Sequence, residues 1–165
     1  MKLTADRLRE LLHYDADTGV FTWINPPGMK MRRGALAGSS SRGDRGYVVI
    51  GIGGRRYRAH RLAWLYATGE WPTGEIDHLN GQRNDNRFAN LRDVTHSLNT
   101  QNLRAKRDRT RSGLLGAQFR GRTRRWRAQI RIGKVRYELG EFDTPEEAHA
   151  AYLAAKRKLH EGCTI

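Results

Sequence analysis

The chain has 165 residues, 38% of them hydrophobic, so it can form one ordinary domain or two small ones with modest cores. Its formal net charge of +14 predicts a polyanionic partner, and nucleic acid is favoured over an acidic membrane surface. Cys163 is the only cysteine, which excludes an internal disulfide and a Cys-rich zinc site, and no apolar run is long enough for a transmembrane helix, so we expect a cytoplasmic protein without a membrane partner.

The first half of the chain predicts a succession of short elements. Thr4 can cap a first helix, which the turn-forming sequence at 15–19 ends. Strand-like runs follow at 20–24 and 47–52. The glycine pair at 53–54 predicts a hairpin turn rather than a phosphate-binding loop, because another strand-like run comes directly after it.

Two helices are predicted on either side of the most polar part of this half. The segment 60–69 predicts a core helix with Gly69 as its natural end. We interpret His60 as a packed ring and Arg61 as a cation that faces solvent or phosphate. A second helix is predicted from His96 to about Arg104.

The stretch 75–92 is unusual because it gathers asparagines and arginines around one Asp-His pair. Phosphodiester hydrolysis needs a base that deprotonates water and a divalent cation that stabilises the leaving oxygen. The imidazole of His78 suits the first task, and hard oxygen ligands such as the Asp77 carboxylate suit Mg²⁺ or Mn²⁺ in the second. Residues 79–81 take the chain out of a strand directly after His78, so the two side chains need not point to opposite faces. The loop asparagines can hydrogen-bond their own backbone and hold this irregular segment.

A basic linker is predicted at 104–112, because these residues are polar and aperiodic. It separates a domain at 1–103 from a second domain at 113–165. The positive charge is concentrated here, since residues 104–137 contain 13 basic residues and one acidic residue. We expect Lys106 and Arg107 to contact DNA phosphates.

Residues 113–165 predict a small three-stranded sheet packed on one helix. Apolar and polar residues alternate, so that one sheet face is apolar, with Trp126 and Tyr137, and the other is cationic. Thr144 starts a capping box for an alanine-rich helix whose inner side extends to Leu159. Solvated charge would mix both signs, whereas this face is nearly all Arg and Gln, the side chains that contact guanine and adenine edges. The face comprises Gln118, Arg120, Arg127, Gln129, Arg131, Arg136 and Glu138.

Residues 113–159 resemble the AP2/ERF DNA-binding domain. The shared motifs are a Trp-x-Ala-x-Ile step at 126–130, a Leu-Gly-x-Phe-x-Thr-x-Glu-Glu-Ala turn at 139–148 and the alanine-rich helix. In that family the three-stranded sheet lies in the major groove. The resemblance implies the same placement for Gln118, Arg120, Gln129, Arg131 and Arg136. Leu115 and Glu138 depart from the family pattern, so no target sequence is transferred.

Residues 57–102 resemble the HNH endonuclease family, in the variant found in phage and intron homing enzymes. The resemblance implies a ββα-metal site in which Asp77 binds the metal, His78 is the general base and Asn90 orients that histidine. Asn99 on the following helix would be the second protein ligand, with His96 as a rival one helical turn away. Because an Asn ligand is neutral, we expect dependence on Mg²⁺ or Mn²⁺ rather than retained zinc.

These features predict a site-specific DNA endonuclease of homing type with an α+β fold. Its expected partner is double-stranded DNA, and it would act as a monomer or weak dimer; a single active site favours nicking unless the protein dimerises. If a phage encodes it, the host cytoplasm is its expected location. One alternative is a DNA-binding protein of transcription-factor type with a non-catalytic HNH module. Another is a general RNA-binding or packaging protein, which explains the charge but not the Asp-His-Asn constellation.

Overall fold

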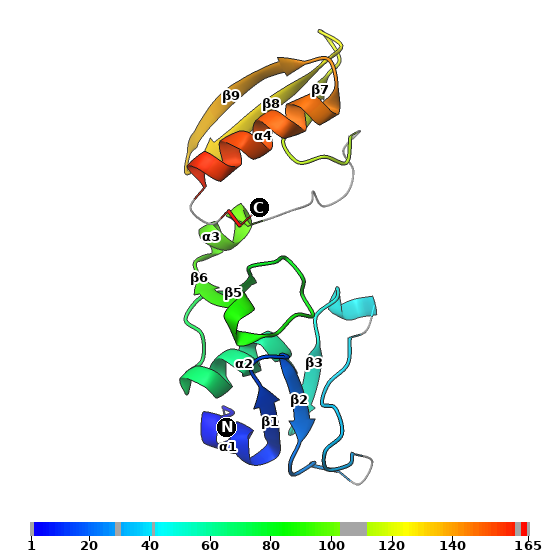
Figure 1. The fold of residues 1–165 in the computed structure, drawn as a ribbon, viewed down its shortest axis with the longest axis vertical. Coiled ribbons are helices and arrows are strands. Elements are labelled where there is room, and N and C mark those ends of the chain that lie inside the picture. The colour runs from blue at the N-terminus through cyan, green and yellow to red at the C-terminus, as the bar shows by residue number, and fades with distance from the viewer. Residues whose placement is uncertain (1, 29–30, 41, 103–111, 161–162, 165) are drawn as a thin grey trace. The chain divides into compact units, whose positions relative to one another are not determined.

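The structure is a computed structural model that describes residues 2–28, 31–40, 42–102, 112–160 and 163–164 (Figure 1). The chain divides into two compact units, Met1–Thr95 and His96–Ile165. Both units combine helices with small antiparallel sheets, as the predicted α+β class requires. Among the described residues, no helix has the length and apolar character of a bilayer-spanning segment.

The first unit contains three antiparallel strand pairs, β1–β2, β3–β4 and β5–β6, among its described residues. Its elements in chain order are α1 (Ala5–Leu11), β1 (Leu12–Asp15), β2 (Val20–Trp23), η1 (Arg42–Asp44), β3 (Val49–Ile52), β4 (Arg55–Arg58), α2 (Ala59–Thr68), β5 (Glu75–His78), η2 (Phe88–Asn90) and β6 (Leu91–Val94).

The core of the first unit brings α1, α2 and the short strands together. Leu8, Leu12, Ile50, Leu62 and Leu65 lose nearly all of their solvent contact there. Burial of each such side chain stabilises the folded unit by about 1.5–3 kcal/mol relative to full exposure. This core supports β5, the strand that carries the Asp-His pair.

Local signals in the sequence explain most element boundaries of the first unit. The Thr4 hydroxyl accepts a hydrogen bond from the Arg7 N–H and caps α1, and Gly69 ends α2 in a left-handed conformation with φ of 83°, as predicted. The glycine pair at 53–54 joins β3 to β4 with two positive φ angles, also as predicted. The end of the first helix was predicted wrongly: α1 stops at Leu11, and the turn at 16–19 joins β1 to β2 instead.

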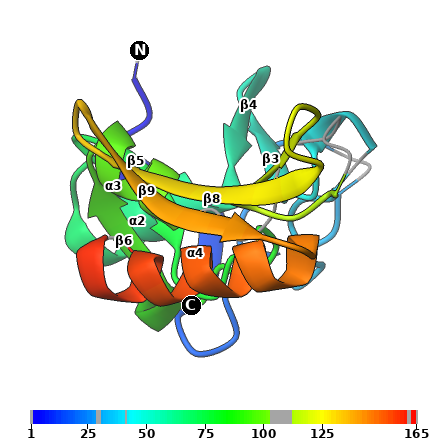
Figure 2. The same ribbon diagram turned by 90° about the horizontal axis from the view of Figure 1, so that it is seen from above.

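The second unit contains a three-stranded antiparallel sheet in the order β7–β8–β9 with one long helix. Its elements are α3 (His96–Gln101), β7 (Ala117–Arg120), β8 (Arg125–Ile132), β9 (Val135–Phe142) and α4 (Pro145–Leu159). Figure 2 shows α4 lying along one side of β8 and β9. The predicted capping box is confirmed: the Thr144 hydroxyl accepts from the Glu147 N–H, and the Glu147 carboxylate accepts from the Thr144 N–H.

Small residues allow α4 to lie close to the sheet. Ala117, Ala128 and Ala148 form the buried centre of this contact. Gly116 has a positive φ of 78° and lies directly under the Tyr152 ring, so that a Cβ atom at this position would overlap the ring. Close packing therefore depends on the absence of a side chain at this glycine.

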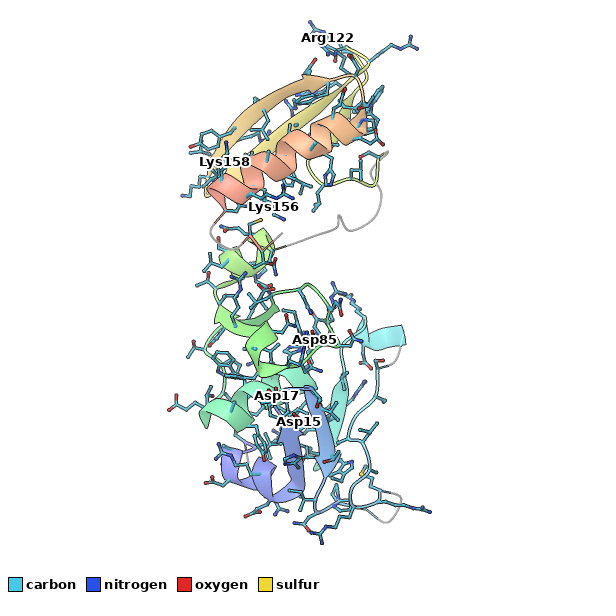
Figure 3. The ribbon with its side chains drawn as sticks, viewed as in Figure 1. Asp15, Asp17, Asp85, Arg122, Lys156 and Lys158 are labelled. Carbon is cyan, nitrogen blue, oxygen red and sulfur yellow. The ribbon has the colours of Figure 1, made fainter. Side chains whose placement is uncertain are left out.

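Two expectations for the apolar side of the second unit need correction. Tyr137 lies opposite Ile130 and so shares its sheet face, but 46% of Tyr137 is exposed. Leu159 was expected on the inner side of the helix and is 45% exposed, whereas Lys156 is 1% exposed with its ammonium 6.0 Å from the Tyr152 ring centre (Figure 3). The buried long side chain in the last turns of α4 is thus Lys156 rather than Leu159.

Candidate functional site

Strand β5 carries the Asp-His pair at its C-terminal end. Its antiparallel partner β6 places Arg92 opposite Asp77 and Leu91 opposite His78. Both residues of the pair are buried, with 6% of Asp77 and 4% of His78 exposed. The chain leaves the strand directly after His78, as predicted. Both residues pair regularly with β6, so their side chains leave the strand on opposite faces, and each is buried on its own side.

Arg92 neutralises the Asp77 carboxylate. Its Nε and Nη2 groups donate hydrogen bonds to Asp77 Oδ2 at 2.9 and 2.7 Å. A buried carboxylate without such a partner would carry a large desolvation cost. The Arg92 guanidinium therefore offsets part of the cost of burying the Asp77 carboxylate.

His78 is surrounded by rings and amides. Its Nε2 atom lies 3.5 Å from Asn86 Oδ1, and its ring centre lies 5.0 Å from that of His60 and 6.1 Å from that of Tyr47. Burial lowers the pKa of His78 below its ordinary value. The imidazole is consequently neutral near pH 7 and able to accept a proton.

The His60 ring packs against the His78 ring. It is 3% exposed, and burial followed by the nearby charges of His78, Arg58 and Arg61 lowers its pKa to about 3. No group in the described parts of the chain hydrogen-bonds its buried Nδ1 atom. His60 is thus the packed ring that the sequence predicted, although its contact with His78 was not foreseen.

The loop after β5 is held by its own asparagines. Asn80 Oδ1 accepts a hydrogen bond from the Gln82 N–H at 2.9 Å, and the Asn80 amide donates to Asp85 Oδ2 at 2.6 Å. Arg87 donates two further bonds to the Asp85 carboxylate, and these contacts lower the Asp85 pKa to about 2. The predicted use of asparagine to fix an irregular backbone is confirmed.

Asn90 and Asn86 both belong to the segment that follows β5, but they make different contacts. Asn90 Oδ1 accepts from the Asn80 N–H at 3.0 Å, and its amide donates to Asn80 Oδ1 and the Asp85 carbonyl. The amide oxygen beside the His78 ring belongs to Asn86, a residue that the sequence reasoning did not single out. Asn90 therefore holds the loop that carries Asn86, and a role for Asn90 in orienting His78 operates through this loop.

The first hairpin supports the other side of the same loop. The Tyr14 hydroxyl donates to the Asn86 carbonyl at 2.7 Å, and the Phe88 N–H donates to the Ala16 carbonyl at 3.1 Å. Gly19 packs directly on the backbone of residues 86–87. Figure 3 labels Asp85 in this loop, Asp15 at the end of β1 and Asp17 in the turn of the hairpin.

Comparison with known protein families agrees with this geometry. A model described as HNH endonuclease matches residues 57–101, a segment that runs from β4 through β5 and β6 to α3. Residues 57–101 form an HNH endonuclease domain. No curated protein and no solved structure matches the chain.

The HNH segment continues into α3, which carries the remaining predicted metal ligands. Asn99 and its rival His96 lie on this helix, which groups with the second compact unit. Their roles as ligands stay predictions. In the described parts of the chain, no three His, Cys, Asp or Glu side chains are close enough to share a metal ion. The two predicted ligands, the Asp77 carboxylate and the Asn99 amide, offer oxygen donors, the type that Mg²⁺ and Mn²⁺ prefer.

Side chains on the solvent face of the second sheet contact one another. Gln118 lies opposite Arg127, Gln129 opposite Glu138, and Arg131 opposite Arg136, so these predicted residues share one face. The Gln129 amide donates to Gln118 Oε1 at 3.0 Å, and Arg127 pairs with Glu138 at 3.2 Å.

The register adds the charged residues Arg125 and Glu141 to this face and places Arg120 on it. Arg125 lies opposite Arg120, and Glu141 lies opposite Arg127. Neither Arg125 nor Glu141 was included in the predicted set. The spacing of Arg125 from Arg127 could have indicated it, whereas Glu141 joins this face only through the irregular register between Ala128 and Gln129. The linker residues Lys106 and Arg107 lie outside the described residues.

Proposed function

We propose that the protein is a site-specific DNA endonuclease of homing type, which hydrolyses phosphodiester bonds with the help of one divalent cation. The observation that carries this proposal is a buried, neutral His78 beside a buried Asp77 carboxylate within an HNH endonuclease domain. The pair supplies a proton acceptor and an anionic ligand, which are the two functions that phosphodiester hydrolysis requires.

In the proposed reaction His78 takes a proton from a water molecule. The water oxygen attacks phosphorus, the bond from phosphorus to one sugar oxygen breaks, and solvent protonates the departing oxygen. Asn86 lies beside the histidine Nε2 atom and helps to fix the ring. A neutral imidazole in a buried position is available as a base over the whole neutral pH range.

Asp77 is the residue of the first unit that would hold the cation, together with Asn99 of α3. A bound Mg²⁺ or Mn²⁺ would stabilise negative charge on the phosphate oxygens. Arg92 balances the Asp77 charge in the folded protein, so it sets the affinity of this carboxylate for a cation.

For the second unit we propose sequence recognition in the major groove of double-stranded DNA, with an AP2-like sheet. The support is a face of Arg and Gln side chains on a sheet whose other side packs on α4. The residues proposed to contact DNA are Gln118, Arg120, Arg127, Gln129, Arg131 and Arg136, with Lys106 and Arg107 on phosphates. We propose that the enzyme works as a monomer or weak dimer.

One observation favours a second candidate, a DNA-binding protein with a non-catalytic HNH module. Arg92 engages the Asp77 carboxylate with two hydrogen bonds, and this contact competes with a metal ion. A catalytic protein must exchange part of this pairing for cation binding, whereas a purely structural module would keep it.

A cleavage assay decides between the two candidates. A pool of supercoiled plasmids with randomised inserts is incubated with the full-length protein and Mg²⁺, and nicked and linear products are sequenced. The nuclease proposal predicts cuts at a recurrent sequence, loss of cutting with EDTA, and recovery with added Mg²⁺ or Mn²⁺. Retention of one DNA sequence without any cut, in either metal, would support the binding protein instead.

A further inference from the structure

Two guanidinium groups lie on one aromatic ring next to His78. The Arg58 guanidinium carbon is 4.6 Å from the Tyr47 ring centre, and that of Arg83 is 5.3 Å from it. The same ring lies 5.1 Å from His60 and 6.1 Å from His78, measured between ring centres. The Tyr47 ring thus lies between two guanidinium groups and the imidazole that we propose as the base.

Neither of these arginines pairs with a carboxylate in the described parts of the chain, unlike their neighbours. Arg56, Arg87 and Arg92 are bound to Asp44, Asp85 and Asp77, respectively. The two arginines that stack on the ring beside the proposed base therefore carry positive charge that no carboxylate of the described residues neutralises. Since both contact one ring, they lie within about 10 Å of each other, where like charges repel. An anion bound between them would relieve this repulsion.

The backbone just before Tyr47 binds the Arg83 side chain. The Arg83 Nη1 group donates a hydrogen bond to the Arg45 carbonyl at 2.9 Å. Arg45 has a left-handed φ of 54°, and Gly46 follows with a φ of 85°. A non-glycine residue in this conformation costs free energy that the surrounding contacts must offset. This unfavourable conformation occurs at the turn whose Arg45 carbonyl accepts the hydrogen bond from Arg83.

The same turn is tied to the strand that carries Arg58. The Arg56 Nη2 group donates to Asp44 Oδ1 at 2.6 Å, and the Tyr47 N–H donates to the Asp44 carbonyl at 3.0 Å. Arg58 follows on the same strand and is exposed to solvent. Its side chain makes no capping hydrogen bond to α2. Stacking on Tyr47 limits the rotamer freedom that such a side chain loses on binding.

We propose that Arg58 and Arg83 bind the DNA phosphodiester at which His78 activates water, and that Tyr47 is the residue that positions both guanidinium groups. This inference rests on the proposed nuclease function. The chemistry fits because a guanidinium presents planar, paired donors that match phosphate oxygens. Charge that develops on these oxygens during hydrolysis is stabilised by donors already in place.

Single-turnover cleavage of a short duplex with the mapped cut site tests the proposal. Arg58→Ala and Arg83→Ala should each lower the rate at saturating protein by about 100-fold, the usual effect of losing one charge-stabilising donor. Arg83→Lys should recover part of the rate. The matched control is Arg55→Ala, another exposed arginine of β4 that does not contact Tyr47, and it should stay within about 3-fold of wild type. Rates for both alanine variants equal to that of Arg55→Ala would overturn the proposal.

The Tyr47 role has its own comparison. Tyr47→Phe keeps the ring face and should cleave much faster than Tyr47→Leu, which has no ring for the guanidinium groups. Circular dichroism and thermal unfolding identify any variant that fails to fold. Equal rates for two folded Tyr47 variants would remove the positioning role, while the arginine variants test phosphate binding independently.

A binding measurement separates this inference from the nuclease proposal. Affinity for a duplex selected for tight binding is measured without divalent metal at several salt concentrations. Loss of one phosphate contact should reduce the slope of log affinity against log salt by about 0.9 in Arg58→Ala and in Arg83→Ala but not in Arg55→Ala. If wild type never cuts but the slopes change in this way, the nuclease proposal fails and the phosphate site stands. Unchanged slopes in a protein that does not cut would overturn the phosphate site as well.

Discussion

Replacement of His60 by phenylalanine should flatten the pH dependence of stability in the first unit. His60 is buried, and His78, Arg58 and Arg61 add positive charge around it, so its pKa in the folded protein is about 3. An unfolded chain restores the ordinary value of about 6.5. Because the folded pKa is lower, the unfolded state binds more protons as pH falls. The stabilisation is complete above about pH 6.5 and is lost progressively towards pH 3.

The size of the effect follows from these two pKa values. When the pH is lowered from 7.5 to 5.5, the unfolding free energy of the first unit should fall by about 1.4 kcal/mol, because His60 stays neutral in the folded state and is protonated in the unfolded state. Burial also lowers the pKa of His78, which adds to the total with the same sign. The difference between wild type and His60→Phe isolates the contribution of His60, because phenylalanine keeps the packed ring and cannot bind a proton.

Urea unfolding at pH 7.5, 6.5 and 5.5 measures this difference. A Trp126→Phe background leaves Trp23, Trp64 and Trp71 as the tryptophans, and all three belong to the first unit. His13→Phe, on the exposed side of β1, is the matched control for the loss of a histidine that is not buried. If His60→Phe loses as much stability between pH 7.5 and pH 5.5 as wild type does, the argument from burial is wrong.

Two further predictions concern the second unit. Gly116→Ala should lower the unfolding free energy of this unit by about 2–4 kcal/mol, because the new methyl group overlaps the Tyr152 ring and the backbone keeps a positive φ. Thermal unfolding measures this change. The control Gly121→Ala, whose methyl group meets open space, should change the unfolding free energy by less than about 1 kcal/mol. Arg131→Ala should reduce discrimination between a selected duplex and a scrambled one by about 1–3 kcal/mol, measured by fluorescence anisotropy. Lys106→Ala should instead weaken both duplexes alike, and an unaltered target preference in Arg131→Ala would count against the sheet as the recognition surface.

Much of the local structure could be predicted from the sequence because its signals act over a few residues. Thr144 and Glu147 form a capping box within one helical turn, and Gly69 ends α2 through its own backbone freedom. The Asp77-His78 pair was likewise expected at the end of a strand, since the sequence leaves strand character directly after it.

Contacts between distant segments could not be predicted in this way. Tyr47, His60 and His78 come from three separate segments, and only the folded core brings their rings together. Pairing of Arg92 with Asp77 depends on the register of β5 and β6, which the motif alone does not specify.

Helical periodicity also misled at one position. It predicted Leu159 on the inner side of α4, but Leu159 is exposed and Lys156, three residues earlier, is buried. A long lysine side chain can cover apolar surface as well as a leucine does, so hydrophobicity alone could not identify the buried position.

The most direct test of the central claim is single-turnover DNA cleavage by His78→Ala. The variant should bind the selected duplex with wild-type affinity, because His78 is 4% exposed and is proposed to contact water rather than the DNA backbone. In the presence of Mg²⁺ its cleavage rate should fall by at least about 100-fold, since general-base catalysis contributes this much or more. Cleavage by a folded His78→Ala protein at the wild-type rate would contradict the assignment of His78 as the base.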